Sequence, residues 1–339
     1  MFKEMNRRDF LKVSAVTGVS ILASDLLYTD PIVYGAVNIP EVEKITITAI
    51  VDNYAETTRP NYKIATRTGD YLSAQHGLSC HIETVVDGRS HSLLFDFGPT
   101  FPGLSANMDA LKIDVDKLEA LVLSHGHRDH FGGLVELLKS RRETIPKGIP
   151  LYVGEEAFAE RGQGQRVAHR PPKKEDVEGL GVVKIVEIKD PTPVVPGAYL
   201  TGRIEKVTGY EKVDPGRWVK IGDNLEPETF IGEQSVVLNL KGKGLVIFTG
   251  CAHVGVVNTV KHAQKISGVE KVHAIMGGFH LTGAKEELIQ RTVADIKAIS
   301  PDYIVPMHCT GFEAIGLFAK EMPDQFILNT VGTRYAFSL

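Results

Sequence analysis

Four side chains of the kinds that bind metal ions lie within one short segment of the chain. Residues 123–134 read Leu-Ser-His-Gly-His-Arg-Asp-His-Phe-Gly-Gly-Leu, which places His125, His127, Asp129 and His130 within six positions. Such side chains need polar partners when buried, and a divalent metal such as zinc or iron supplies one. In an extended segment the first two histidines point the same way, whereas a helix that begins near Asp129 directs that carboxylate and His130 elsewhere. The spacing therefore predicts two metal ions rather than one.

The flanking residues predict the elements that hold this segment in place. Residues 119–124 read as a short buried strand, and the leucine spacing within residues 131–138 is helical. Between them, Gly132 and Gly133 would let the helix approach the metal ions closely.

Three later histidines each follow an apolar run that reads as a strand. They are His253, His280 and His308, and each has a glycine nearby. Open α/β sheets place their ligands at such strand ends, so we expect these histidines to join the site. The other candidates without this context are expected at the surface: His91, His169, His262 and His273.

The segment from His125 to His130 resembles the HxHxDH signature of the metallo-β-lactamase superfamily. The resemblance implies that the first metal takes His125, His127 and a third histidine. It implies that the second takes Asp129, His130 and a late histidine, which maps onto His308. Asp96 maps onto the strand aspartate that orients the histidine loop from behind the ligands.

The chain departs from the superfamily pattern where an aspartate usually bridges the two metals. The matching strand-end position holds Cys251. Cys251 could bridge or ligate as a thiolate, His253 could take over, or a solvent oxide could bridge unaided. We expect His253 to be a ligand, with Cys251 as an adjacent ligand. Cys80 and Cys309 are expected to be small buried residues at strand ends.

Four further segments resemble one branch of the superfamily. This branch is named after dihydropterin ribofuranosyl-aminobenzene 5′-phosphate synthase, and the resemblance covers residues 44–339. One fold hosts many reactions, so the branch name is a weak guide to the substrate. The segments are Gln75–Ser79, Thr249–His253, Gly277–Leu281 and Met307–Gly311.

The resemblance implies a hydrolase with two divalent ions, zinc being expected and iron or manganese being alternatives. Two cations lower the pKa of a bound water to about 7, and the hydroxide attacks a carbonyl or phosphoryl centre of a small substrate. Asp129, His280 and His76 are the predicted catalytic residues, the two histidines for substrate binding or proton delivery. The rivals are a non-haem iron redox protein of the same fold and a non-catalytic metal-bound binding protein.

The order of predicted elements favours an α/β fold, a four-layer αββα sandwich with the metals at one edge. Residues 44–339 form this domain, and residues from about 155 to 233 are expected to be an insertion or lid over the site. Expected strands are 44–51, 79–86, 92–97, 119–124, 151–153, 181–188, 198–207, 235–240, 244–249, 272–276, 303–307 and 333–337. Expected helices are 131–138, 254–266, 284–299 and 312–320.

A basic cluster lies within the expected insertion. It is either a solvated face or a site that recognises an anionic group such as phosphate. Its members are Arg161, Arg166, Arg170, Lys173 and Lys174.

Composition and the first residues limit the class of protein. The chain has 339 residues, is 43% hydrophobic and carries a formal net charge of −4, which argues against a nucleic-acid partner. Residues 6–12 resemble a twin-arginine export motif, and the apolar stretch 13–23 is too short for a membrane span. Residues 1–36 are therefore expected to be a signal segment for the twin-arginine export machinery, which would carry the folded protein out of the cytoplasm.

Overall fold

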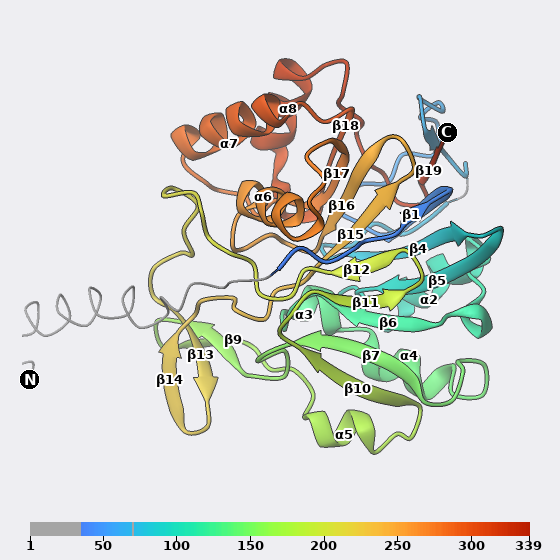
Figure 1. Ribbon diagram of the computed structural model, residues 1–339. Coiled ribbons are helices and arrows are strands. Elements are labelled where there is room, and N and C mark those ends of the chain that lie inside the picture. Colours follow the sequence, from blue (N-terminus) through green and yellow to red (C-terminus); the bar gives the residue numbers. More distant parts are fainter. Residues whose placement is uncertain (1–34, 70) are drawn as a thin grey trace, which may run out of the picture. The chain divides into compact units, whose positions relative to one another are not determined.

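The computed structural model describes residues 35–69 and 71–339. The signal segment expected over residues 1–36 thus lies, up to residue 34, outside the described residues. Within the described part, two large sheets pack face to face and helices cover their outer sides (Figure 1). Among the described helices, none is long and apolar enough to cross a membrane.

The first large sheet has eight strands in the order β10-β7-β6-β5-β4-β2-β19-β3. Strands β5, β6, β7 and β10 run parallel, whereas β4, β2 and β19 are paired antiparallel. Alternation within β4 sends Cys80 and Ile82 into the core between the sheets. The bounds are β2 Lys44–Val51, β3 Ala65–Thr66, β4 Ser79–Val86, β5 Arg89–Phe95, β6 Ala120–Leu123, β7 Ile149–Gly154, β10 Val183–Ile188 and β19 Arg334–Ser338.

The second large sheet has seven strands. Six of them lie in the order β11-β12-β15-β16-β17-β18, and the short strand β1 pairs with β15 outside this row. Strands β16, β17 and β18 are parallel, and the helices α6 and α7 make the crossovers between them. Because both faces of these strands are covered, their sequences are nearly continuous apolar runs. The bounds are β1 Glu41–Val42, β11 Thr192–Val195, β12 Ala198–Leu200, β15 Ser235–Leu240, β16 Gly244–Thr249, β17 Val272–Gly278 and β18 Tyr303–Met307.

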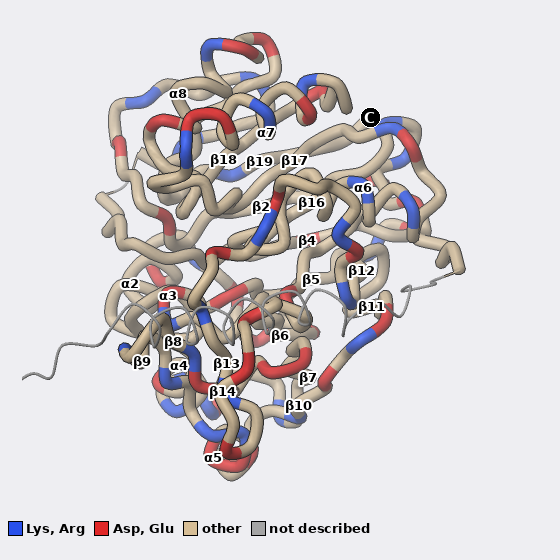
Figure 2. The backbone as a smooth tube through the Cα atoms, turned by 90° about the vertical axis from the view of Figure 1, so that its left-hand side faces the viewer, with Lys and Arg blue, Asp and Glu red and all other residues tan. Residues whose placement is uncertain are grey.

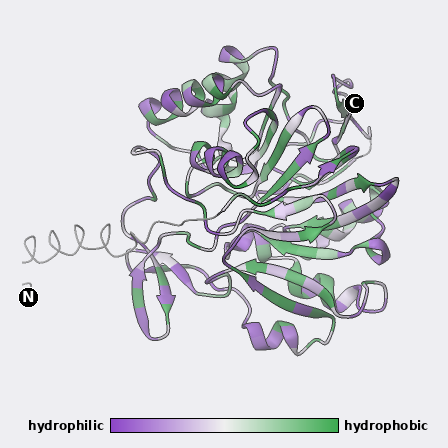
Figure 3. Cartoon of the chain, viewed as in Figure 1, coloured by the Kyte–Doolittle hydropathy of each residue, from purple (hydrophilic) through white to green (hydrophobic). Residues whose placement is uncertain are grey.

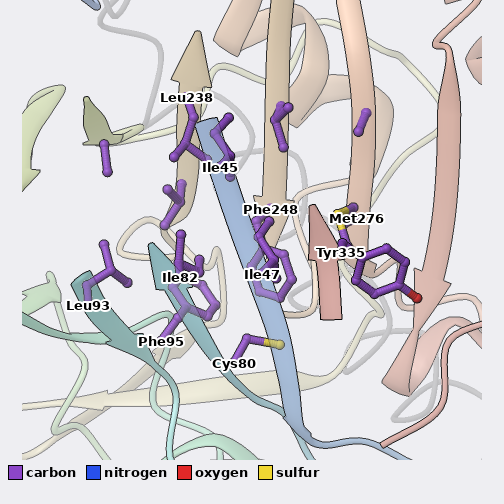
Figure 4. Packing of buried hydrophobic residues seen from close by; sticks show 14 of the residues in the cluster. Ile45, Ile47, Cys80, Ile82, Leu93, Phe95, Leu238, Phe248, Met276 and Tyr335 are labelled. Carbon is purple, nitrogen blue, oxygen red and sulfur yellow. The ribbon is translucent and has the colours of Figure 1, made fainter. Parts of the chain in front are cut away.

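Three apolar cores separate four layers. The core between the sheets contains Ile45, Ile47, Phe95, Phe248 and Met276 (Figure 4). A second core lies under α2, α4 and α5, and a third lies under α6, α7 and α8. The green strands and the purple outer faces of the helices in Figure 3 show the same division. The predicted αββα sandwich is therefore confirmed. The helix bounds are α2 Phe101–Ala110, α3 Arg128–Phe131, α4 Leu134–Ser140, α5 Lys174–Glu178, α6 Val256–Ser267, α7 Glu286–Ile299 and α8 Phe312–Glu321, with 3-10 turns at η1 Val115–Lys117 and η2 His308–Thr310.

Residues 155–233 contribute to all three sheets of the described chain. Strand β10 joins the eight-stranded sheet, and β11 and β12 join the seven-stranded sheet. The remaining strands form a small sheet in the order β14-β13-β8-β9. That this stretch acts as a lid stays a prediction. The small-sheet bounds are β8 Arg161–Gln163, β9 Arg166–His169, β13 Arg217–Ile221 and β14 Asn224–Pro227.

The strand expected over residues 198–207 is wrong beyond Leu200. Gly202 adopts a φ of +66°, and a Cβ there would lie 2.5 Å from the carbonyl carbon of Asp190. The chain therefore turns out of the sheet at this point. The strand expected over residues 92–97 begins earlier, at Arg89, in the structure. It ends at Phe95, because Asp96 has a left-handed φ of 59°.

Basic and acidic residues are interspersed over the described chain, as Figure 2 shows for α7 and α8. This mixture agrees with the small net charge of −4.

Candidate metal centre

The candidate metal centre lies where the carboxyl ends of parallel strands from both large sheets meet. Strands β5 and β6 of one sheet and β16, β17 and β18 of the other each end one or two residues before a predicted site residue. Open α/β sheets place ligands at such an edge because the chain leaves each strand there and its side chains are free to converge. The residues that follow these strands are Asp96, Ser124, His125, Cys251, His253, His280 and His308.

Three imidazoles form one cluster of donor atoms. His125, His127 and His253 each offer a ring nitrogen, and these atoms lie within 4.8 Å of one another. Nε2 of His253 is 3.2 Å from Nδ1 of His127, and all three residues are buried. Nε2 of His125 is buried and has no hydrogen-bond partner within the described chain. Three histidines with room for a further ligand fit a catalytic zinc site.

A second cluster forms around the carboxylate of Asp129. Its Oδ2 atom is 3.2 Å from Nε2 of His308 and 3.9 Å from Nε2 of His130. His76 approaches from the other side, with its Nε2 3.7 Å from the same oxygen, but 68% of its side chain is exposed. A carboxylate with two buried imidazoles suits a second divalent ion.

Cys251 lies between the two clusters. Its Sγ atom is 3.1 Å from Nε2 of His130, and the donor atoms of His125, His130 and Cys251 lie within 4.8 Å of one another. The thiol is therefore placed beside ligands of both predicted metal ions. The geometry brings together all seven predicted ligands, so the residues present fit two ions.

The protonation states of the free site suit metal binding. Burial, followed by neighbouring positive charge, holds the pKa values of His125, His127 and His253 well below the usual range, so these rings are neutral. Burial alone would lower the pKa of His130, but Asp96 and Asp129 together raise it to about 9. The carboxylates that hold a proton on His130 would equally attract a cation, and metal binding displaces such protons.

Asp96 orients the histidine loop from behind. Its two carboxylate oxygens accept hydrogen bonds from the backbone N–H of Ser124 at 2.7 Å and from the Ser124 hydroxyl at 2.7 Å. Its Oδ2 atom is also 2.6 Å from Nδ1 of His130. Nε2 of His130 therefore faces the site, as the second-metal assignment requires.

Two further buried carboxylates support ligands, and sequence reasoning missed both. Asp52, at the end of β2, accepts the backbone N–H of His308 at 2.7 Å. Glu233 accepts the backbone N–H groups of His253 at 2.9 Å and Val254 at 3.0 Å. No motif marks these residues, because only the tertiary fold brings them to the histidines.

Several non-glycine residues around the site adopt left-handed backbone conformations. Such conformations cost free energy and concentrate at functional sites, where the surrounding structure holds them. The residues and their φ angles are Asp96 59°, Phe230 52°, Ala252 54°, His280 45° and His308 48°.

Gly132 and Gly133 allow a close approach to the backbone of the chain after β5; that they bring the helix close to metal ions stays a prediction. A Cβ on Gly132 would lie 2.1 Å from the carbonyl oxygen of Pro99, and one on Gly133 would lie 2.4 Å from that of Phe97. The two glycines thus let α3 and α4 pack against the chain that follows Asp96.

Comparisons with known proteins agree with this geometry. The family model described as the metallo-beta-lactamase superfamily matches residues 84–208. The chain is 33% identical to the 7,8-dihydropterin-6-methyl-4-(beta-D-ribofuranosyl)-aminobenzene-5′-phosphate synthase of Methanocaldococcus jannaschii over 300 residues, which is 85% of this chain and 95% of that protein. The chain belongs to the metallo-beta-lactamase superfamily. Within it, the chain belongs to the branch of that synthase.

Other relatives extend the comparison. An uncharacterized protein of Methanocaldococcus jannaschii is 29% identical over 261 residues, covering 76% of this chain and 92% of that protein. The crystal structure of Tm1679, described as a metal-dependent hydrolase of the beta-lactamase superfamily, has a TM-score of 0.70 at 23% identity and covers 87% of this chain and 100% of its own. This structural similarity concerns the fold.

In this superfamily member, three of the histidines expected at the surface are partly or fully buried. His169 is partly buried, and its ring stacks on that of His127 with centroids 4.0 Å apart. His262 is buried between the backbone N–H of Glu205 and the carbonyl of Thr201. His273 is buried and lies 2.6 Å from Asp302. The prediction was wrong because it used only the position of each histidine relative to a strand end. A histidine can also be buried where its ring nitrogens pair with a nearby backbone group or carboxylate.

His280 and Cys309 lie beside His253 and Cys251. The ring of His280 contacts that of His253 with centroids 3.9 Å apart, and the side chain of His280 hydrogen-bonds Cys309. The thiol of Cys309 also lies 3.7 Å from the backbone oxygen of Cys251. Cys80 and Cys309 are both buried, as expected, and Cys309 in addition lies beside the site residues Cys251 and His308.

The five basic residues of the expected insertion do not form one exposed surface patch, because Arg161 is buried. Arg161 is buried, and its Nε lies 2.7 Å from Glu228. Arg170 is exposed and approaches Glu160 at 3.4 Å. Arg166 and Lys173 are exposed and Lys174 is partly exposed. Arg217, a residue outside the predicted cluster, lines two pockets beside the metal centre, as described below.

Proposed function

We propose that this protein is a dinuclear metal-dependent hydrolase that acts on a small, phosphate-bearing substrate. One observation carries the proposal: His125, His127 and His253 converge beside Asp129, His130 and His308, with Cys251 between the two sets. Zinc is the proposed metal, and two bound cations would supply an activated water and stabilise developing negative charge.

The protein residues around the ions have separable tasks. The chain holds six nitrogen and oxygen ligands and one sulfur ligand on α3 and just after β6, β16 and β18, so little reorganisation is needed on binding. Nδ1 of His76 lies 3.2 Å from Nδ2 of Asn53, which can only donate, so the His76 proton belongs on Nε2. That exposed atom faces Asp129 and is positioned to donate a proton to a leaving group or to bind substrate.

The phosphate group of the substrate is supported by the name of the Methanocaldococcus jannaschii relative, whose product carries a 5′-phosphate. The same relative supports a second candidate, because it is named a synthase. In that case this chain would join the 6-methyl carbon of a dihydropterin that carries a leaving group there to a ribofuranosyl-aminobenzene phosphate, and the leaving group and a proton would be released. Supplying both compounds and searching for the joined product by mass spectrometry tests this candidate directly.

The hydrolase proposal is tested by metal analysis together with turnover. We expect two equivalents of zinc by plasma mass spectrometry and hydrolysis of at least one generic phosphodiester, ester or lactone. His125→Ala combined with His127→Ala should lose at least one metal equivalent and the activity, whereas His91→Ala, a remote histidine paired with Glu119, should keep both. Iron with redox activity would replace the proposal by the redox alternative, and one metal without turnover would replace it by a binding protein.

We also propose that the protein is exported by the twin-arginine route. The Arg7-Arg8 pair before an apolar stretch supports this. Changing both residues to Lys should leave the precursor in the cytoplasm, and unchanged export after cell fractionation would refute the proposal.

A further inference from the structure

A cavity of about 550 Å³ opens directly beside the metal centre. His253 and His280 line its inner end. Its other walls come from two segments that are distant in sequence, residues 210–217 and residues 279–292. A volume of this size holds a small organic molecule, and it lies where the non-reacting part of a substrate would extend from the metals.

Two buried polar atoms of cavity-lining residues have no hydrogen-bond partner among the described residues. Thr292 is only 1% exposed, and its Oγ1 has no hydrogen-bond partner in the described part of the chain. Nδ1 of His280 is likewise buried and unpaired among the described residues. An unsatisfied buried polar group costs about 1–3 kcal/mol, so these atoms point to a ligand with hydrogen-bonding groups.

The charged residues of the cavity wall are mainly positive. Lys212, Arg217 and Lys285 line it. Of the two acidic residues named among its lining, Asp214 is paired with Arg217 at 3.1 Å.

The other acidic residue, Glu211, accepts hydrogen bonds from backbone N–H groups of α6. Its two oxygens accept the N–H groups of Val257 at 3.0 Å and Asn258 at 2.8 Å. Its charge is therefore engaged at the start of α6 rather than offered to a ligand, which leaves the cavity suited to an anion.

Arg217 is the best placed of the three cations. It lies at the start of β13, and its side chain is 23% exposed. It lines the large cavity with His253, and it also lines a small adjoining pocket with His127. Arg217 therefore stands next to histidines of the first predicted metal. Its Nε and Nη2 donate to Oδ2 of Asp214 at 3.2 and 3.1 Å, and the Asp214 side chain is 57% exposed, so a phosphate that binds here replaces this carboxylate on the planar fork.

The cavity also has an apolar wall, to which Phe279 and Leu281 contribute together with the partly buried Leu288. We propose that this cavity binds the non-reacting part of the substrate and that this part is an organic phosphate. Its apolar body packs against this wall, its polar groups meet Thr292 and His280, and its phosphate pairs with Arg217. This inference rests on the proposed hydrolase function, because it assigns the reacting bond to the metals.

Binding of phenylphosphonate, which has an apolar ring and a group that cannot be hydrolysed, tests the cavity without requiring turnover. Calorimetry on the metal-loaded protein should show affinity at least tenfold weaker in Arg217→Gln. Lys220→Gln is the matched control, because Lys220 is an exposed cation on the same strand and is not among the cavity-lining residues. Thr292→Val should also weaken binding, by several-fold, since it removes the hydroxyl and keeps the volume.

Equal affinity in wild type and Arg217→Gln would overturn the proposal, because the anion would then sit on the metals alone. Metal content and thermal unfolding of each variant exclude a folding defect as the cause of weaker binding. If the protein hydrolyses esters, the mono-4-nitrophenyl ester of glutaric acid and the 4-nitrophenyl ester of pentanoic acid give a second readout. The ratio of their kcat/KM values should fall at least tenfold in Arg217→Gln and remain at the wild-type value in Lys220→Gln.

Discussion

The Sγ atom of Cys251 lies 3.1 Å from Nε2 of His130, at the point where the sequence pattern predicts a cysteine in place of a bridging carboxylate. Cys251 is buried at the end of β16, and Gly250 brings it close to Ser124, which supports the histidine loop. A thiolate among imidazoles favours softer metals such as zinc and disfavours magnesium. This substitution distinguishes the site chemically from one built on an aspartate bridge.

Cys251→Ser should lower the metal content from two equivalents to about one. The hydroxyl of serine is a poorer ligand than a thiolate, and it stays protonated at neutral pH. Plasma mass spectrometry of protein purified with zinc measures the change, and Cys80→Ser, which alters a buried thiol in the core between the sheets, is the control. Retention of both equivalents in Cys251→Ser would show that Cys251 is not a ligand.

Asp96→Asn should weaken metal binding about 10–100-fold while the fold is kept. The amide has one acceptor oxygen where the carboxylate has two, so it cannot serve both Ser124 and Nδ1 of His130. Competition with a zinc-binding dye measures the affinity. Asp302→Asn changes a carboxylate that contacts His273 just before β18, at the opposite end of that strand from His308, and should leave metal affinity unchanged. An equal effect of both substitutions would contradict the role given to Asp96.

Glu233→Gln should weaken binding of the first metal and also destabilise the protein. The glutamine can accept only one of the two N–H groups, from His253 or Val254, and a buried N–H left unpaired costs about 1–3 kcal/mol. Denaturant unfolding and metal titration measure the two effects.

Glu211→Gln is a matched control for this prediction. Glu211 also accepts two backbone N–H groups, those of Val257 and Asn258, but it holds no predicted ligand. It should lose stability while metal affinity stays at the wild-type value. A loss of metal affinity equal to that of Glu233→Gln would refute a specific role for Glu233.

Protonation of the buried His262 should lower the free energy of unfolding in mild acid. Burial lowers the pKa of His262 below its usual value of 6.5, and its Nδ1 accepts the N–H of Glu205. A histidine with a lowered pKa contributes full stability above pH 6.5, and this contribution is lost as the pH falls from 6.5 through the lowered value. The neutral His262→Gln variant should therefore lose less stability than wild type between pH 7 and pH 5.

Thermal unfolding at several pH values measures this difference, and His91→Gln, at a partly exposed position, is the control. Parallel loss of stability in wild type and His262→Gln would show that another group governs the acid response.

The sequence predicted most of the strands and helices because their signals are local. Strands β15 to β18 are continuous apolar runs, and the spacing of Leu288, Val293 and Ile296 marks α7. The small sheet of β8, β9, β13 and β14 escaped prediction, since its strands are short and largely exposed. Such strands form through pairing with partners distant in the chain, which no local pattern reveals.

The candidate ligands were predictable to the extent that they follow strands. His253 and His308 have this context, and the structure brings both to the site. Asp52 shares the strand-end context, because it directly follows Lys44–Val51, but nothing in the sequence assigns it to a histidine. Glu233 lacks this context, and His169 stacks on His127 only because the small sheet places it there. The acids that support ligands are thus a property of the tertiary structure rather than of any motif.

The position of β19 sets an order of events during synthesis. This strand pairs with β2 on one side and with β3 on the other, and Lys44 lies opposite Ser338. The eight-stranded sheet, which carries Asp96 and the histidine loop, therefore cannot close until residues 334–338 have left the ribosome. Such long-range pairing folds slowly, so the unclosed edge of β2 would stay available to chaperones or to other chains throughout translation.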